Sequence, residues 1–148
     1  LFVSEAIAPR ALQMQRYLPP TPIRCLLDVN GTDLAGKVSF DTLQSQLEGV
    51  PKHLASKIAK SQRDTVERLV DRAEALADVQ HQGLVERASA QFHADLDEEI
   101  ERLKALRQVN PLVRDSEITA LESQKHNGSE ALRQAKVRLD ALRVLVVG

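Results

Sequence analysis

The sequence predicts an α+β domain in which a small, mostly antiparallel sheet accompanies a long antiparallel helical hairpin. Three observations predict this class: turn-rich segments of alternating polarity in the first forty residues, helical periodicity over most of the remainder, and an apolar, β-branched run at residues 144–147. At 148 residues the chain is long enough for one domain with a buried core. We expect a single domain, 1–148, in which residues 1–50 are rich in strands and turns, residues 51–140 are helical and residues 141–148 form a closing strand.

The first forty residues contain the predicted strands. Residues 1–8 are rich in apolar side chains, whereas three prolines in residues 17–22 are incompatible with a helix interior. Residues 23–28 alternate in polarity and lead into an Asn-Gly pair, which favours the left-handed dihedral angles of a tight turn. We therefore expect strands over residues 1–8 and 23–28, with residues 34–40 as the return segment of a hairpin.

A long helical region follows. Between residues 51 and 110, apolar side chains recur every three or four positions, the spacing of an amphipathic helix. One straight helix of this length would extend about 90 Å at 1.5 Å per residue, so the helix either breaks or projects as an arm. Gly83 lies in a polar stretch and is the expected break, although a glycine costs a continuous helix only about 1 kcal/mol.

A second helix is predicted over residues 116–140. Asn110-Pro111 ends the preceding helix, and Asp115 or Ser116 can cap the new one. Asn127-Gly128 is expected to weaken its middle.

Together with residues 84–109, the second helix would form an antiparallel hairpin that leads into the apolar run at residues 144–147. We expect this run to enter the sheet beside a strand from the start of the chain. Such pairing would hide an edge that otherwise recruits other chains.

The bulk composition excludes several classes of protein. Twenty basic and twenty-one acidic residues give a net charge of −1, so no global field attracts nucleic acid or anionic lipid. A single cysteine, Cys25, rules out an intrachain disulfide. No charged n-region precedes an apolar core and no stretch approaches eighteen apolar residues, so we expect neither a signal peptide nor a membrane partner. The sequence begins without Met inside a strand-like segment, and we expect it to be a piece of a larger protein.

The motifs of common catalytic sites are absent from the sequence. There is no glycine-rich phosphate loop, GxSxG elbow, HExxH or paired-cysteine motif. We therefore expect no enzyme activity in this chain, and we assign no catalytic, cofactor-binding or metal-binding residue to it.

Three isolated features have a structural and a functional interpretation. His93 and Asp97 lie one helical turn apart and could share a metal, but a zinc site uses three or four ligands, so a solvated pair is the favoured reading. The acidic run at residues 95–101 is typical of an exposed helix face. Cys25 alternates with apolar neighbours, which favours a buried and unreactive thiol.

One stretch has a local electrostatic character. We define the cationic patch as Lys52, Lys57, Lys60 and Arg63, and no acidic residue lies between residues 51 and 62. Such a patch is a candidate contact for nucleic-acid phosphates or for a partner protein. No aromatic side chain is interleaved to stack on a base, so a solvated surface is the competing interpretation.

Three passages carry a resemblance to a known family: RYLPPTPIRCLLDVNG (residues 16–31), LKALRQVNPLVRDSEITALES (residues 103–123) and RLDALRVLVV (residues 138–147). In sequence, order and spacing they resemble the carboxy-terminal region of the RapA family of bacterial RNA polymerase-associated proteins. The resemblance spans nearly the whole chain. The Asn127-Gly128 pair departs from the unbroken helix expected in relatives.

The resemblance implies a non-catalytic, C-terminal accessory domain of a large SWI/SNF-type ATPase. Such a protein translocates on nucleic acid, binds RNA polymerase and promotes its recycling. ATP and Mg would serve the full-length protein, whose motifs for them have no counterpart here. The implied partners are other domains of the same ATPase, RNA polymerase and DNA or RNA, in the bacterial cytoplasm at the nucleoid. No functional residue transfers to this chain.

Two alternatives come from other classes of protein. The long apolar stripe with charged flanks also fits a self-associating, coiled-coil-like module without a nucleic-acid role. An unrecognised small enzyme or metal protein would depend on His93 and Asp97 alone.

Overall fold

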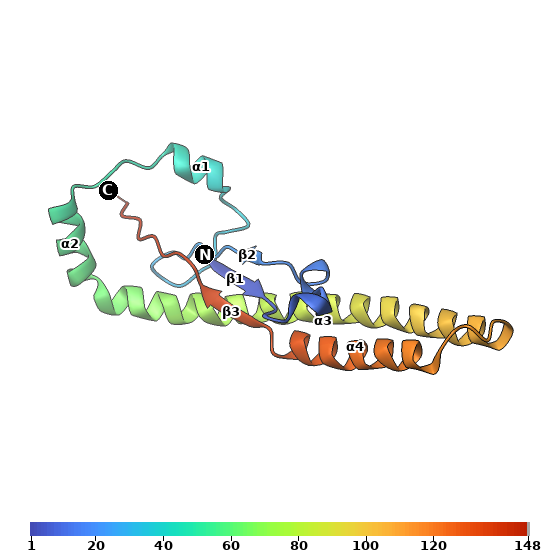
Figure 1. Cartoon of the computed structure of the whole chain (residues 1–148). Coiled ribbons are helices and arrows are strands. Elements are labelled where there is room, and N and C mark those ends of the chain that lie inside the picture. The colour runs from blue at the N-terminus through green and yellow to red at the C-terminus, as the bar shows by residue number, and fades with distance from the viewer. Residues whose placement is uncertain (148) are drawn as a thin grey trace.

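In the computed structural model, which describes residues 1–147, a single long helix spans the molecule, and the sheet and the second long helix pack along it (Figure 1). Its elements in chain order are β1 (Phe2–Glu5), the 3-10 turns η1 (Arg10–Leu12) and η2 (Met14–Arg16), β2 (Thr21–Ile23), α1 (Phe40–Ser45), α2 (Lys52–Ser61), α3 (Arg63–Val109), α4 (Asp115–Arg133) and β3 (Lys136–Leu139). The α+β class predicted from the sequence is confirmed.

The sheet joins the two ends of the chain. Its strand order is β2-β1-β3, and both pairs are antiparallel. Phe2 lies opposite Ile23 on one side and opposite Leu139 on the other. Phe2, Ile23 and Ala77 of α3 form a small buried cluster, so the sheet packs on the first half of the long helix.

The strand predicted at residues 23–28 is wrong in extent. Only Ile23 belongs to β2, and the rest of this hairpin is an isolated bridge between Leu27 and Asp33 with a backbone hydrogen bond on either side of it. Side chains add to this short ladder, because the Asp33 carboxylate accepts from the Leu26 and Ala35 N–H groups, and Arg24 donates to two backbone carbonyls.

The turn predicted at Asn30-Gly31 is present, but only Gly31 of the pair is left-handed. Gly31 has a φ of +84°, a conformation that glycine adopts without steric cost. The N–H groups of Thr32 and Asn30 donate to the Asp28 carboxylate and hold its pKa below the usual value.

The break predicted at Gly83 is also wrong. α3 is 47 residues long, about 70 Å at 1.5 Å per residue, and it continues through Gly83 without a break. The chain bends instead at Gln62, whose dihedral angles are not helical and which separates α2 from α3. Residues on both sides of Gly83 pack into the core, and this burial outweighs the glycine's cost of about 1 kcal/mol.

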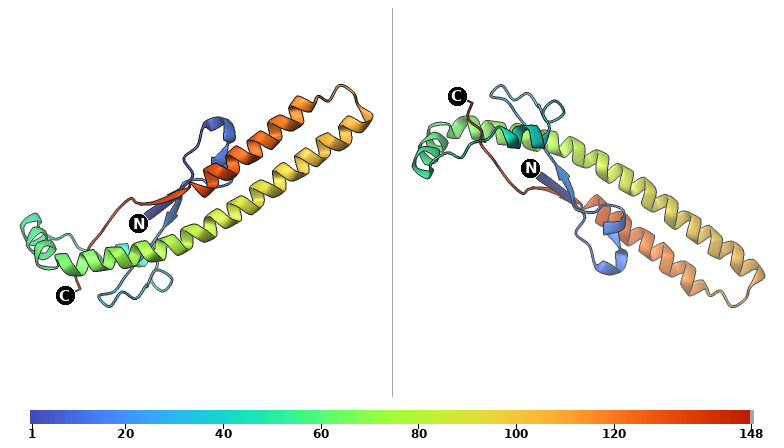
Figure 2. Two further views of the ribbon diagram at one scale, coloured as in Figure 1. Left: turned by 90° about the horizontal axis from the view of Figure 1, so that it is seen from below. Right: turned by 90° about the horizontal axis from the view of Figure 1, so that it is seen from above.

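The antiparallel hairpin of α3 and α4 is confirmed. Figure 2 shows the two helices side by side from the sheet to the far tip, where they form a projecting arm. Asn127 and Gly128 do not interrupt α4, which is continuous to Arg133. Gly128 is buried, because its backbone lies directly against the ring of Phe92.

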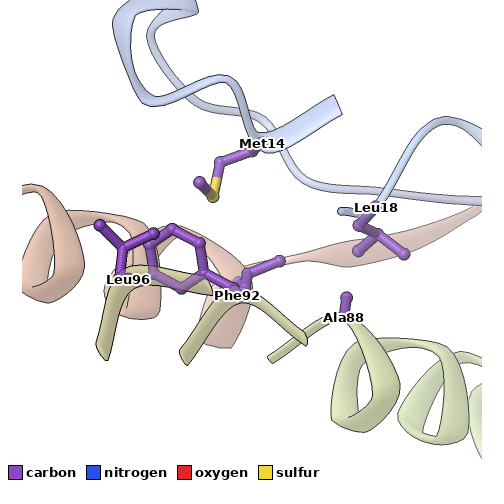
Figure 3. Packing of buried hydrophobic residues seen from close by; sticks show 6 residues of the cluster. Met14, Leu18, Ala88, Phe92 and Leu96 are labelled. Carbon is purple, nitrogen blue, oxygen red and sulfur yellow. The ribbon is translucent and has the colours of Figure 1, made fainter. Parts of the chain in front are cut away.

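The larger hydrophobic cluster fills the junction between η2, α3 and α4 (Figure 3). Met14 and Leu18 lie over the face of α3 that presents Ala88, Phe92 and Leu96. The cluster also includes an edge-to-face stacking of Tyr17 on Phe92 at 5.0 Å and the buried Leu132 of α4.

The closing strand predicted at residues 141–148 does not form within the described residues, and Gly148 lies outside them. The strand that closes the sheet is β3, Lys136–Leu139, which the sequence interpretation had placed in the second helix. α4 ends at Arg133, and Val137 then packs against the cluster of Phe2 and Ile23. The expected pairing between the two ends of the chain is therefore present, several residues before its predicted position.

Candidate functional site

The cationic patch lies at the end of the molecule opposite the hairpin tip (Figure 1). Lys52, Lys57 and Lys60 belong to α2, and Arg63 is the first residue of α3. All four side chains are exposed. The structure therefore brings the four predicted residues to one bent segment at the surface.

The four charges are not equally available. Arg63 Nε donates to Glu67 Oε1 at 2.7 Å, an exposed i,i+4 pair that offsets its charge. Among residues 1–147, no ion pair involves Lys52, Lys57 or Lys60. The three lysines of α2 therefore carry the positive charge that remains for an anionic partner.

The sequence of α2 divides its surface into two faces. At about 100° per residue, the three lysines fall on one half of the helix together with His53, which sequence reasoning did not single out. Leu54 and Ile58 fall on the other half. No residue of α2 is buried, and Leu54 is 44% exposed, so the apolar face is uncovered within the described structure.

The His93 and Asp97 pair is engaged in contacts between α3 and α4. Ser129 Oγ donates to the Lys125 carbonyl, so it accepts from His93 Nε2 at 2.7 Å, and this nitrogen has no lone pair for a metal. Asp97 Oδ1 lies 2.5 Å from Lys125 Nζ. Across residues 1–147, no three His, Cys, Asp or Glu side chains come together where they could hold a metal ion.

The same contacts line an open groove of about 500 Å³ between α3 and α4. Acidic and basic side chains both line it, and its histidines are His93 and His126. Lys125 pairs with Asp97 across the two helices, whereas Lys104 pairs with Glu101 within α3. These contacts make the groove a structural seam of the arm.

The acidic run is only partly the exposed face that was expected. Asp95 accepts from the Tyr17 hydroxyl at 3.1 Å and from Arg16 at 3.4 Å, and so fastens the first segment to α3. The pKa of Tyr17 is raised above its usual value of 10.0, chiefly by burial and secondly by the Asp95 carboxylate.

Cys25 is half-buried, and its thiol lies 3.7 Å from the Ala73 carbonyl. Burial, with the nearby Asp33 carboxylate, raises the pKa of this thiol. A raised pKa keeps the sulfur protonated at neutral pH, which agrees with an unreactive cysteine.

A structural residue that the sequence did not reveal is His81. Its Nε2 lies 3.2 Å from the Ala135 carbonyl, which can only accept, so Nε2 carries the proton. The other ring nitrogen, Nδ1, therefore accepts from the fully buried Ser4 hydroxyl at 2.7 Å. His81 thereby connects α3 to β1 and to the junction between α4 and β3.

Comparison with known proteins places this arrangement in a family. A family model described as RNA polymerase recycling family C-terminal matches residues 1–147. The chain belongs to this family.

Relatives in the RNA polymerase recycling family match the whole chain. The RNA polymerase-associated protein RapA of Pseudomonas aeruginosa (strain LESB58) is 53% identical over 148 residues, and that of Stutzerimonas stutzeri (strain A1501) is 54% identical. The RapA protein of Pseudomonas putida (strain W619) is 51% identical. In each case the match covers 100% of this chain and 16% of the relative.

The family match includes the cationic patch, the arm and the sheet. None of the helices in the described part of this family member is long and apolar enough to cross a bilayer.

Proposed function

We propose that the chain is a non-catalytic C-terminal domain of a longer, ATP-dependent protein that translocates on nucleic acid, binds RNA polymerase and promotes its recycling. Within that protein, the domain serves as an interaction or bracing module. The observation that carries the proposal is the match of residues 1–147 to the RNA polymerase recycling family, together with relatives named as RNA polymerase-associated. ATP and Mg belong to the remainder of such a protein, which acts at the bacterial nucleoid.

The geometry of the chain supports a bracing role. The arm is held by a continuous helix, a buried aromatic cluster and ion pairs between helices, whereas α2 and the segment after β3 present uncovered faces at the opposite end. A domain that is rigid at one end and has uncovered surfaces at the other is suited to contact two partners at once. The candidate partners are the ATPase lobes of the same protein, RNA polymerase, and DNA or RNA at the lysines of α2.

The test of the non-catalytic assignment is an ATPase assay on the chain alone, with and without DNA. We expect no turnover above a protein-free blank, while a full-length protein of this family assayed in parallel hydrolyses ATP. Turnover that stays with the purified chain would overturn the assignment.

The alternative, a self-associating helical module without a nucleic-acid role, depended on an apolar stripe along the helices. In the structure, five residues of the α3 stripe are buried by the same chain: Ala77, Ala88, Phe92, Leu96 and Ile100. The middle of that surface is therefore already occupied, which favours the interaction module over self-association.

A further inference from the structure

The apolar tail, residues 142–147, leaves the sheet without finding a partner. Of its six side chains five are apolar, and Leu142, Val144, Val146 and Val147 are 57%, 47%, 59% and 95% exposed. Among the described residues, none of its backbone groups bonds to another backbone group. β-branched residues with unpaired backbone groups have the composition of a strand and the hazard of an open sheet edge.

The ladder between β1 and β3 does not stop at the last paired residues. Leu1 accepts through its carbonyl from the N–H groups of both Asp140 and Ala141, at 2.9 and 3.2 Å, and its own nitrogen donates to the Ala141 carbonyl at 2.8 Å. Two residues opposite one, with this set of bonds, form a β-bulge, beyond which pairing normally resumes. Leu1 and Ala141 are therefore a hydrogen-bonded pair, beyond which the ladder can continue along the tail.

We propose that the apolar tail is the docking edge for the segment that precedes Leu1 in a longer protein, which extends β1 backward and pairs antiparallel with residues 142–147. The occupant follows from the register and from the family. The chain covers 16% of its relatives and matches a family region described as C-terminal, so the relatives hold additional chain on the side of Leu1. In a longer protein, the backbone N–H of Leu1 takes the place of the terminal ammonium and donates the same hydrogen bond to the Ala141 carbonyl.

The register assigns each backbone group of the tail. Counting on from the Leu1 and Ala141 pair, the six residues before Leu1 lie opposite residues 142–147. In an antiparallel ladder, hydrogen-bonded and non-hydrogen-bonded pairs alternate. The N–H groups of Arg143, Leu145 and Val147 therefore face the added strand, while those of Leu142, Val144 and Val146 face away from it.

The surroundings of the tail fit burial inside a larger protein. The neighbouring elements also expose large apolar side chains, namely Phe40 of α1, Val50 before α2 and Leu54 of α2. Arg143 Nη1 donates to Gln44 Oε1 at 2.8 Å, which holds the tail toward α1. An added strand would cover the same end of the molecule (Figure 1).

The proposal deepens the bracing role, since it names the segment through which the domain connects to the rest of the protein, and it rests on that role. Amide hydrogen exchange measured by NMR tests it in two forms: this chain, and a longer form that includes the residues before Leu1. We expect fast exchange throughout the tail of this chain. In the longer form, the amides of Arg143, Leu145 and Val147 should exchange on the order of a hundredfold more slowly than those of Leu142, Val144 and Val146.

A matched pair of proline variants in the longer form sharpens the test. Leu145→Pro removes an N–H that faces the added strand, whereas Val144→Pro removes one that faces the open edge, where proline is tolerated. We expect the first variant to abolish protection of Arg143 and Val147, and the second to retain it.

Equal, fast exchange of all six tail amides in the longer form would overturn the proposal. So would protection that appears in this chain and rises with its concentration, because the occupant would then be a second copy. The exchange pattern reports only the backbone ladder, so its failure leaves the ATPase result and the proposed function unaffected.

Discussion

At the scale of single residues, the two helical glycines have opposite roles. A methyl group built on Gly128 would overlap Cζ of Phe92 and lie 2.8 Å from Cε1, in the middle of the hydrophobic cluster. At Gly83 the nearest atom is the flexible end of Arg87, at 3.7 Å. Gly128 therefore permits the close approach of α4 to α3, whereas Gly83 only weakens the helix.

We predict that Gly83→Ala stabilises the chain by about 0.5–1 kcal/mol, the gain in helix propensity. Gly128→Ala is expected to destabilise it by about 1–3 kcal/mol, because the aromatic ring must move within a packed core. Urea unfolding of both variants checks this pair, which is matched in chemistry and secondary structure. Equal effects of the two substitutions would show that Phe92 does not require a glycine opposite it.

At the scale of elements, α2 differs from α3 because its bend at Gln62 turns it away from the core. A helix of ten residues without burial has little stability of its own. Contacts of a partner with its lysine face and its apolar face would therefore stabilise α2. The absence of acidic residues from α2 leaves its positive charge unpaired within the helix.

We predict that reversing Lys52, Lys57 and Lys60 to Glu weakens DNA or RNA binding by the longer protein on the order of tenfold or more. The slope of the logarithm of the binding constant against the logarithm of the salt concentration should become less steep by up to about three, because each lost phosphate contact removes nearly one released counterion. A matched control reverses Arg10, Lys37 and Arg114, which are also exposed but scattered over other elements. Binding that changes equally in both triple variants would show that α2 acts only through net charge.

At the scale of the whole molecule, the chain is an arm joined to a small sheet, and the contacts that join them connect segments distant in sequence. The sheet pairs strands from the two ends of the chain, and His81 connects this sheet to the long helix through hydrogen bonds. Since the middle of the apolar stripe of α3, from Ala77 to Ile100, is buried internally, the arm has no continuous seam left for a coiled coil.

We therefore predict that the chain sediments as an elongated monomer at micromolar concentration. Sedimentation velocity gives both the mass and the frictional ratio, and the latter should exceed that of a compact protein because α3 alone is about 70 Å long. A mass that rises with concentration would instead favour the self-associating module.

The sequence by itself determined the α+β class, the antiparallel hairpin, the turn at Asn30-Gly31 and the cationic face of α2. These features depend on periodicity and turn chemistry, which are local. Its resemblance to the RapA family, carried by three passages, was likewise a property of the residues alone and is confirmed by the family match.

Only the tertiary structure decided which residues form the closing strand, whether Gly83 breaks a helix and what His93, Asp97 and Gly128 contact. Local preferences at such positions amount to about 1 kcal/mol or less, so burial elsewhere can override them. Lys136–Leu139 pairs with β1 because the end of α4 and the small cluster around Phe2 place it there, although residues 144–147 have the stronger strand composition. The apolar tail therefore has the sequence of a strand, and it lacks only the partner that long-range packing would supply.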